Sequence, residues 1–150
     1  MKLLKLYSWI TGTMTDFTKP FSENKALYNQ AKGFWNKLEN SSLVIVLIFL
    51  VLGIAWAAYY YTSYNNSPGR HYTPKHWVLM LLATVVVTFL VTLGFEYFAV
   101  EPKVNGAFLL EVKIAFANAL YVAGIYFLTS FVWCNCFRTN AYRFLKLKKK

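Results

Sequence analysis

Acidic residues and catalytic motifs are scarce in this 150-residue sequence. Six residues are acidic and Asp16 is the single aspartate, so the chain alone lacks the paired aspartates of an intramembrane aspartic protease. It contains no H-E-x-x-H zinc motif, Gly-rich phosphate loop or G-x-S-x-G nucleophile elbow. No histidine falls within an apolar run, where it could activate Ser130. The sequence therefore argues against an enzyme and calls for no cofactor, although an active site shared with another subunit stays open.

Potential metal ligands are also few. Cys134 and Cys136 form a C-x-C pair, and a three-span topology brings them to the same membrane surface as His71 and His76. Thiols and imidazoles are zinc ligands, but neither spacing is usual for a zinc finger. We favour histidines within a belt of aromatic residues and cysteines that are small apolar residues or acylation sites. A metal site at these four residues is the weaker alternative.

Apolar residues, in contrast, are abundant, at 57% of the chain. Three runs, near Leu43–Thr62, Trp77–Val100 and Ile114–Phe137, reach the roughly 20 residues that a helix needs to cross a hydrocarbon core. They do not alternate as the strands of a membrane β-barrel do. The sequence predicts an all-α integral membrane protein with three transmembrane helices in residues 43–137 and a basic tail in residues 138–150.

Residues 1–42 predict one or two amphipathic juxtamembrane helices before the first span. Residues 3–17 carry apolar side chains at helical spacing, and no signal-peptide cleavage site follows, so we interpret this segment as retained. Its apolar face can lie in the membrane interface or pack on protein, and the pattern favours neither. Lys19-Pro20 should end this helix, and Ser22 could cap a second one over Glu23–Glu39.

The second run carries a regular polar ladder. Thr84, Thr88, Thr92 and Glu96 follow one another at intervals of four, which places them on one helix face. One reading is a packing face, in which the threonines bond to their own helix and Glu96 pairs with Lys103 or Lys113. The other is a polar path with Glu96 as a proton- or cation-binding group. The first is favoured, with the ladder facing protein and the leucines and valines opposite facing lipid.

Small and aromatic residues predict helix contacts and interface anchors. Small residues and one amide mark packing faces on the first and third spans: Gly53, Ala57, Ala115, Asn118, Ala119 and Ala123. Aromatic residues near the ends of the helices predict anchors at headgroup level: Trp35, Trp56, Tyr59, Tyr60, Tyr61, Trp77 and Trp133.

The net charge of +10 predicts contact with anionic lipid rather than with nucleic acid, because the basic residues are scattered beside the spans. The tail supplies the candidate headgroup ligands Arg138, Arg143, Lys146, Lys148, Lys149 and Lys150. Lysines and arginines near the span ends slightly favour a cytoplasmic C-terminus, whereas exporting the N-terminal region without a signal peptide opposes it. We expect a bacterial cytoplasmic membrane, or the endoplasmic reticulum in a eukaryote, where the final lysines resemble a retrieval signal.

Three helices present more surface suited to helix packing, in their small-residue and polar faces, than they can bury against one another. The sequence therefore favours a non-enzymatic subunit that anchors or scaffolds a larger membrane complex, with other subunits or further copies as partners. The alternative is a homo-oligomeric pore or ion-coupled channel, including a holin-like or membrane-disrupting effector, that uses the ladder face.

Overall fold

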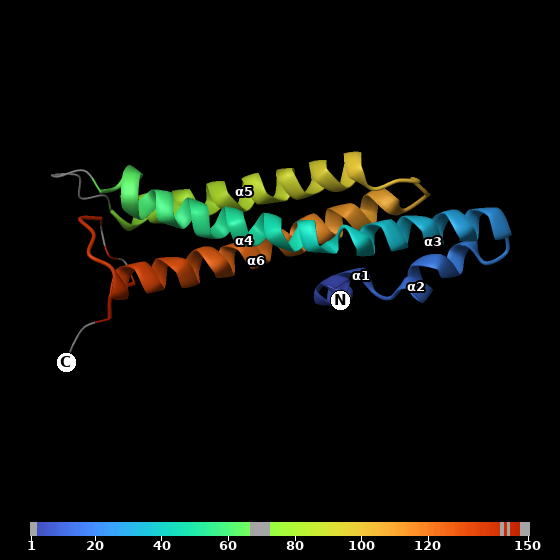
Figure 1. Ribbon diagram of the computed structural model, residues 1–150, viewed down its shortest axis with the longest axis horizontal. Helices are drawn as coiled ribbons and strands as arrows, with labels where there is room; N and C mark the ends of the chain where they lie inside the picture. Colours follow the sequence, from blue (N-terminus) through green and yellow to red (C-terminus); the bar gives the residue numbers. More distant parts are fainter. Residues whose placement is uncertain (1–2, 67–72, 142, 144, 148–150) are drawn as a thin grey trace. The chain divides into compact units, whose positions relative to one another are not determined.

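The computed structural model describes residues 3–66, 73–141, 143 and 145–147, which form helices and no strand. Three helices are long and apolar enough to cross a membrane (Figure 1): α4 (Ser42–Tyr59, extended by a π-helical turn to Tyr64), α5 (Pro74–Ala99) and α6 (Ala107–Cys136). The predicted all-α fold with three candidate spans is confirmed.

The N-terminal segment is not the single helix that its apolar spacing predicts. A 3-10 turn (Leu3–Tyr7) leads into α1 (Ser8–Thr11), and the chain then breaks at Gly12. Gly12 has a φ of 72°, which only glycine adopts without strain. Thr13 then caps α2 (Met14–Thr18) in a reciprocal capping box with Asp16. A glycine at this one position therefore divides the predicted helix.

Helix α3 (Lys25–Asn40) confirms a second amphipathic helix, with a different cap. After the 3-10 turn Lys19–Phe21, the side chain of Asn24 accepts hydrogen bonds from the first turn of α3, so Ser22 is not the cap. The apolar stripe lies inside the protein: Ala31, Phe34, Trp35 and Leu38 are buried. Phe17 packs against the rings of Phe34 and Trp35 at centroid distances of 5.7 and 5.8 Å. The apolar face of α3 is thus covered by other parts of the same chain.

The chain forms two compact units, each of which contains parts of all three long helices. Unit 1 comprises Met1–Ile48 and Phe89–Asn118, and unit 2 comprises Phe49–Thr88 and Ala119–Lys150. Unit 1 therefore includes the N-terminal helices and the turn between α5 and α6. In that turn, Gly106 has a φ of 81°, the left-handed conformation that lets the chain enter α6.

Gly53 is a point of close helix packing within unit 2. A Cβ added there would lie 2.7 Å from Cγ2 of Ile125 and 3.2 Å from Cγ2 of Val122. Gly94 of α5 offers a contrast, because a Cβ there meets no atom within 4 Å. Small-residue packing at Gly53 is as the sequence predicts.

Gly53→Ala is therefore expected to lower the free energy of unfolding by about 1–3 kcal/mol, the usual cost of overpacking. Gly94→Ala, which adds the same methyl group within a helix, should leave stability unchanged or raise it slightly. Unfolding of the detergent-solubilised variants by denaturant titration compares the two. Equal stability of both variants would contradict the packing described at Gly53.

Candidate functional site

The polar ladder of α5 is buried. The exposed fractions of Thr84, Thr88, Thr92 and Glu96 are 1% or less. Large apolar side chains occupy the outer surface of the same helix, among them Leu79, Leu82, Val86 and Leu90, which are exposed by 56–61%. The ladder therefore faces protein, in agreement with the packing-face prediction.

The threonines of the ladder differ in their partners. Thr84 Oγ1 donates to the carbonyl of Met80 at 2.7 Å, the bond within the helix that the spacing predicts. Thr92 Oγ1 accepts a hydrogen bond from Asn118 at 3.0 Å. Thr88 Oγ1 is buried and has no hydrogen-bond partner in the described part of the chain.

Asn118 of α6 connects four segments of unit 1. Its Nδ2 donates to Thr92 Oγ1 and, at 2.9 Å, to the carbonyl of Ile45 in α4. Its Oδ1 accepts from the hydroxyl of Tyr7 at 2.6 Å. Asn118 and Tyr7 are both fully buried. One amide thus fastens the three long helices to one another and to the N-terminal segment.

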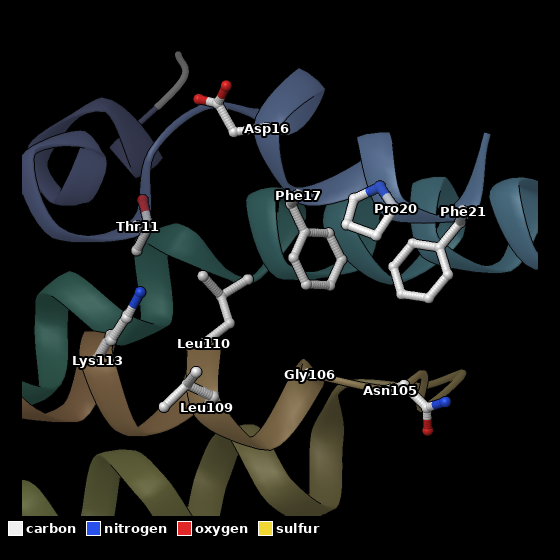
Figure 2. Close-up of a pocket in the computed structure, with 10 residues that line it drawn as sticks. All are labelled: Thr11, Asp16, Phe17, Pro20, Phe21, Asn105, Gly106, Leu109, Leu110 and Lys113. Carbon is white, nitrogen blue, oxygen red and sulfur yellow. The ribbon is translucent and has the colours of Figure 1, made fainter.

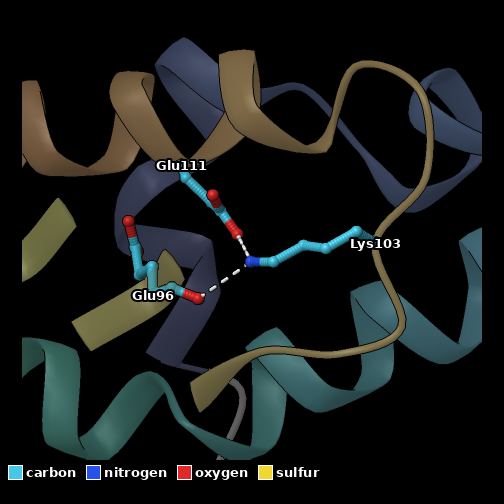
Figure 3. A network of polar contacts seen from close by, with 3 residues as sticks. All are labelled: Glu96, Lys103 and Glu111. Atoms are coloured by element: carbon cyan, nitrogen blue, oxygen red, sulfur yellow. Dashed lines mark hydrogen bonds and ion pairs between the residues drawn. The ribbon is translucent and has the colours of Figure 1, made fainter. Parts of the chain in front are cut away.

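A second buried group lies at the turn between α5 and α6 (Figure 3). Lys103 forms an ion pair with Oε1 of Glu111 and donates to the backbone carbonyl of Glu96 at 3.1 Å. Its ammonium also lies 5.8 Å from the ring centroid of Phe34 and 5.2 Å from that of Tyr97. Both attractions stabilise a cation in a site that is partly closed to water.

The ion pair at this site differs from the predicted one. Lys103 pairs with the carboxylate of Glu111 and not with that of Glu96. Both side-chain oxygens of Glu96 lack a hydrogen-bond partner among the described residues. Lys113 lines a separate hollow of about 470 Å³ in unit 1, together with Asp16, Phe17 and Leu110 (Figure 2). Glu111 is also fully buried, so it does not extend to the interface as its place near the start of α6 suggests.

The charges of this site are unbalanced. Two fully buried carboxyl groups, Glu96 and Glu111, share one ammonium group, that of Lys103. Of their four side-chain oxygens, one contacts Lys103 and three have no hydrogen-bond partner within the described ranges. A buried charge without a partner is costly, so the site favours binding one proton or a further cation. Lys103, with 36% of its side chain exposed, lies at the opening of this site to solvent.

The predicted helix-packing residues are mostly buried. Ala57, Ala115 and Ala119 are at most 5% exposed, and Ala123 is partly buried. Their small side chains allow neighbouring helices to approach closely.

Several predicted interface anchors lie instead in protein cores. Trp35 is 6% exposed beneath Phe17 in unit 1. In unit 2, Tyr60, Tyr61 and Trp77 form a buried cluster, and Trp77 Nε1 donates to Ser130 Oγ at 3.1 Å. Burial rather than contact with headgroups therefore accounts for these four rings. Tyr59 is exposed, and the remaining rings, Trp56 and Trp133, are partly buried.

The cysteines and histidines do not form a metal site within the described residues. Buried Cys134 donates to the hydroxyl of Tyr61 at 3.3 Å, whereas Cys136 is exposed. Nδ1 of His76 lies 3.3 Å from the hydroxyl oxygen of Thr73, within hydrogen-bond distance. His71 falls outside the described residues, which contain no group of three or more histidine, cysteine, aspartate or glutamate side chains placed to hold a metal ion.

The described part of the tail is attached to unit 2. Asn135 Nδ2 donates to the carbonyl of Leu145, and Asn135 Oδ1 accepts from the backbone of Leu147. Arg138 and Lys146 are exposed, and Arg143 is partly buried. The predicted headgroup ligands Lys148, Lys149 and Lys150 lie outside the described residues.

Comparison with protein-family models, curated proteins and solved structures finds no match for this chain. The site rests on its own geometry.

Sequence reasoning missed two members of these networks, Tyr7 and Glu111, the carboxylate that pairs with Lys103. Tyr7 stands four residues after Leu3 and three before Ile10, so helical spacing could have placed it on the inner face. Glu111 lies near the start of a span, and nothing in its spacing indicates a partner across the turn.

Asp16 allows a test of the N-terminal fold by pH. The hydroxyl of Thr13, at 2.6 Å, and its backbone N–H, at 2.8 Å, donate to Asp16 Oδ2, and these bonds lower the pKa of the carboxyl group. Because the folded-state pKa is depressed, the capping box contributes stability above the ordinary pKa of aspartate and loses it as the pH falls through the folded value.

Thr13→Val is expected to raise the pKa of Asp16 toward its ordinary value, since it removes the hydroxyl donor. Asp16 is the single aspartate, so ¹³C-aspartate labelling gives one carboxyl resonance for an NMR titration. Thr18→Val is the matched control, because the hydroxyl of Thr18 donates to the carbonyl of Met14 at 2.9 Å and not to Asp16. An unchanged pKa in Thr13→Val would show that the capping box does not form.

Proposed function

We propose that this chain is a non-enzymatic integral membrane subunit that anchors or scaffolds a larger membrane complex. The observation that carries the proposal is helix α3, which precedes the first span by one residue, Ser41. Its apolar stripe is held inside unit 1. Its opposite side displays Lys25, Asn29, Lys32 and Asn36, all exposed.

These four residues follow one another at intervals of four, three and four, so they form one ridge along the helix. Because α4 with its π-helical extension already provides 23 residues, enough to cross the hydrocarbon core, α3 extends beyond it into water or the headgroup region. A fixed helix with a basic, amide-rich ridge suits a partner with acidic and hydrogen-bonding groups.

Site-specific photocrosslinking in native membranes tests this docking surface. A photoreactive residue at Asn29 should give one discrete protein adduct, whereas the same residue at exposed Leu90 of α5 should react mainly with lipid. Charge reversal by Lys25→Glu with Lys32→Glu should abolish the Asn29 adduct. The absence of any protein adduct at Asn29 would contradict the proposal.

A second function, proton or cation coupling, is favoured by one observation, the unbalanced pair Glu96 and Glu111. A pore that uses the ladder as its lumen is less well supported, because the ladder is buried within one chain. If the carboxyl pair binds a transported ion, Glu96→Gln should abolish flux while the protein still folds. If the native chain shows no flux and Glu96→Gln fails to fold, the carboxyl pair has a structural role.

The proposal extends to localisation. We place the chain in the cytoplasmic membrane of a bacterium. In a eukaryotic host, the membrane of the endoplasmic reticulum is the alternative.

A further inference from the structure

A polar hollow of about 540 Å³ lies in unit 2 where the tail meets the end of the first span. It is lined by Asn66, Arg138, Thr139, Asn140 and Arg143. The lining thus presents two guanidinium groups together with amide and hydroxyl groups, all of which can donate hydrogen bonds.

The backbone around the hollow is held by hydrogen bonds. The N–H of Asn140 donates to Oδ1 of Asn66 at 3.2 Å, and Thr139 Oγ1 donates to the carbonyl of Tyr61 at 3.1 Å. Arg143 donates to the carbonyl of Thr139 at 3.3 Å, which uses one of its five N–H groups. Hydrogen bonds therefore hold the segment that carries the two arginines, and most of the arginine donors have no partner among the described residues.

The net positive charge of unit 2 favours an anionic partner. The two sequence segments of this unit, 49–88 and 119–150, contain eight lysines and arginines and no aspartate or glutamate. Neither arginine of the hollow can therefore pair with a carboxylate side chain of its own unit. An anion from outside the chain is the natural partner.

The position of the hollow indicates where that anion comes from. Asn66 follows the end of the first span at Tyr64, and Arg138 follows the end of α6 at Cys136, each by two residues. Helix ends of membrane spans lie at the level of lipid phosphates. Arginine forks bind phosphate oxygens in pairs, which gives a geometry that scattered lysines do not provide.

We propose that Arg138, Arg143 and the amides of Asn66 and Asn140 form a binding site for the phosphate of an anionic phospholipid headgroup. A free phosphate ion shares this chemistry, but the level of the site favours the lipid. The inference depends on the membrane placement and not on the docking function of α3.

Titration of phosphatidylglycerol into the full chain in neutral detergent, followed by native mass spectrometry, tests the site. Arg138→Gln with Arg143→Gln should weaken binding roughly 30-fold, on the basis of about 1 kcal/mol for each basic residue. The control Lys19→Gln with Lys37→Gln removes the same charge from exposed positions of unit 1 and should bind as the native chain does. Circular dichroism verifies that both variants fold.

Two further arms make the test specific. Arg138→Lys with Arg143→Lys retains the charge and loses the fork, so it should bind several-fold more weakly than the native chain. Three results would overturn the site: native affinity in that variant, an equal loss of affinity in the Lys19→Gln, Lys37→Gln control, or binding of phosphatidylcholine as tight as that of phosphatidylglycerol. Inorganic phosphate that displaces the lipid at equal concentration would overturn the assignment to a lipid headgroup.

Discussion

Lys103→Gln is expected to lower the free energy of unfolding by about 3 kcal/mol. The change removes the cation that faces Glu111 and the carbonyl of Glu96. Breaking a buried pair by removing one partner costs about 3–5 kcal/mol, because the other charge stays buried without compensation. We take the lower end because 36% of the lysine side chain is exposed. Denaturant unfolding in detergent measures the loss.

The double variant Lys103→Gln, Glu111→Gln distinguishes a charge effect from a packing effect. It removes both members of the pair, so most of the stability lost in Lys103→Gln should return. Lys113→Gln serves as control, since Lys113 lines the separate hollow beside Asp16 and should cost less than about 1 kcal/mol. A double variant as unstable as Lys103→Gln would mean that the lysine stem, not its charge, stabilises the turn.

Asn118→Ala should cost about 2 kcal/mol and loosen the N-terminal segment. It removes the bonds to Tyr7, Ile45 and Thr92, each worth about 0.6 kcal/mol on average within membranes, and leaves buried polar groups unsatisfied. Tyr7→Phe removes one of these bonds and should cost correspondingly less.

Hydrogen exchange provides the specific readout for Asn118. Amides of α1 and α2 should lose protection in Asn118→Ala, because Tyr7 no longer fastens their segment to α6. Asn29→Ala, an exposed asparagine on α3, is the matched control and should leave both stability and protection unchanged. Equal behaviour of the two variants would show that the Asn118 network does not hold the segment.

The spans and the inward ladder could be predicted because their causes are local. Twenty consecutive apolar residues specify a membrane helix wherever they occur. A polar residue at every fourth position specifies a face, and four such residues on an otherwise apolar helix are cheaper to bury against protein than against lipid. Burial of Thr84 to Glu96 follows from these two rules.

The partners of the buried charges could not be predicted in the same way. The sequence places Glu96, Lys103 and Glu111 near one turn, but it does not say which oxygen the ammonium reaches. That choice depends on the backbone path between Val100 and Gly106. Likewise, the break at Gly12 depends on one left-handed residue within a pattern that is otherwise helical.

The aromatic residues illustrate a different limit. Amphipathic rings near a span end are typical of interface anchors, but the same rings also fill protein cores. Tyr61 is buried, its hydroxyl accepts from Cys134 and its backbone carbonyl accepts from the tail residue Thr139. Contacts of this kind with the tail have no short-range sequence signal.

Flux measurements on proteoliposomes that contain only the purified chain test the central claim most directly. The claim is that the ladder, including the carboxyl group of Glu96, faces protein within one chain and that the chain serves as a subunit, not as a pore. Proton and potassium flux, read with entrapped dyes, should equal that of protein-free vesicles. A leak that appears with the native chain and disappears with folded Glu96→Gln would contradict the claim.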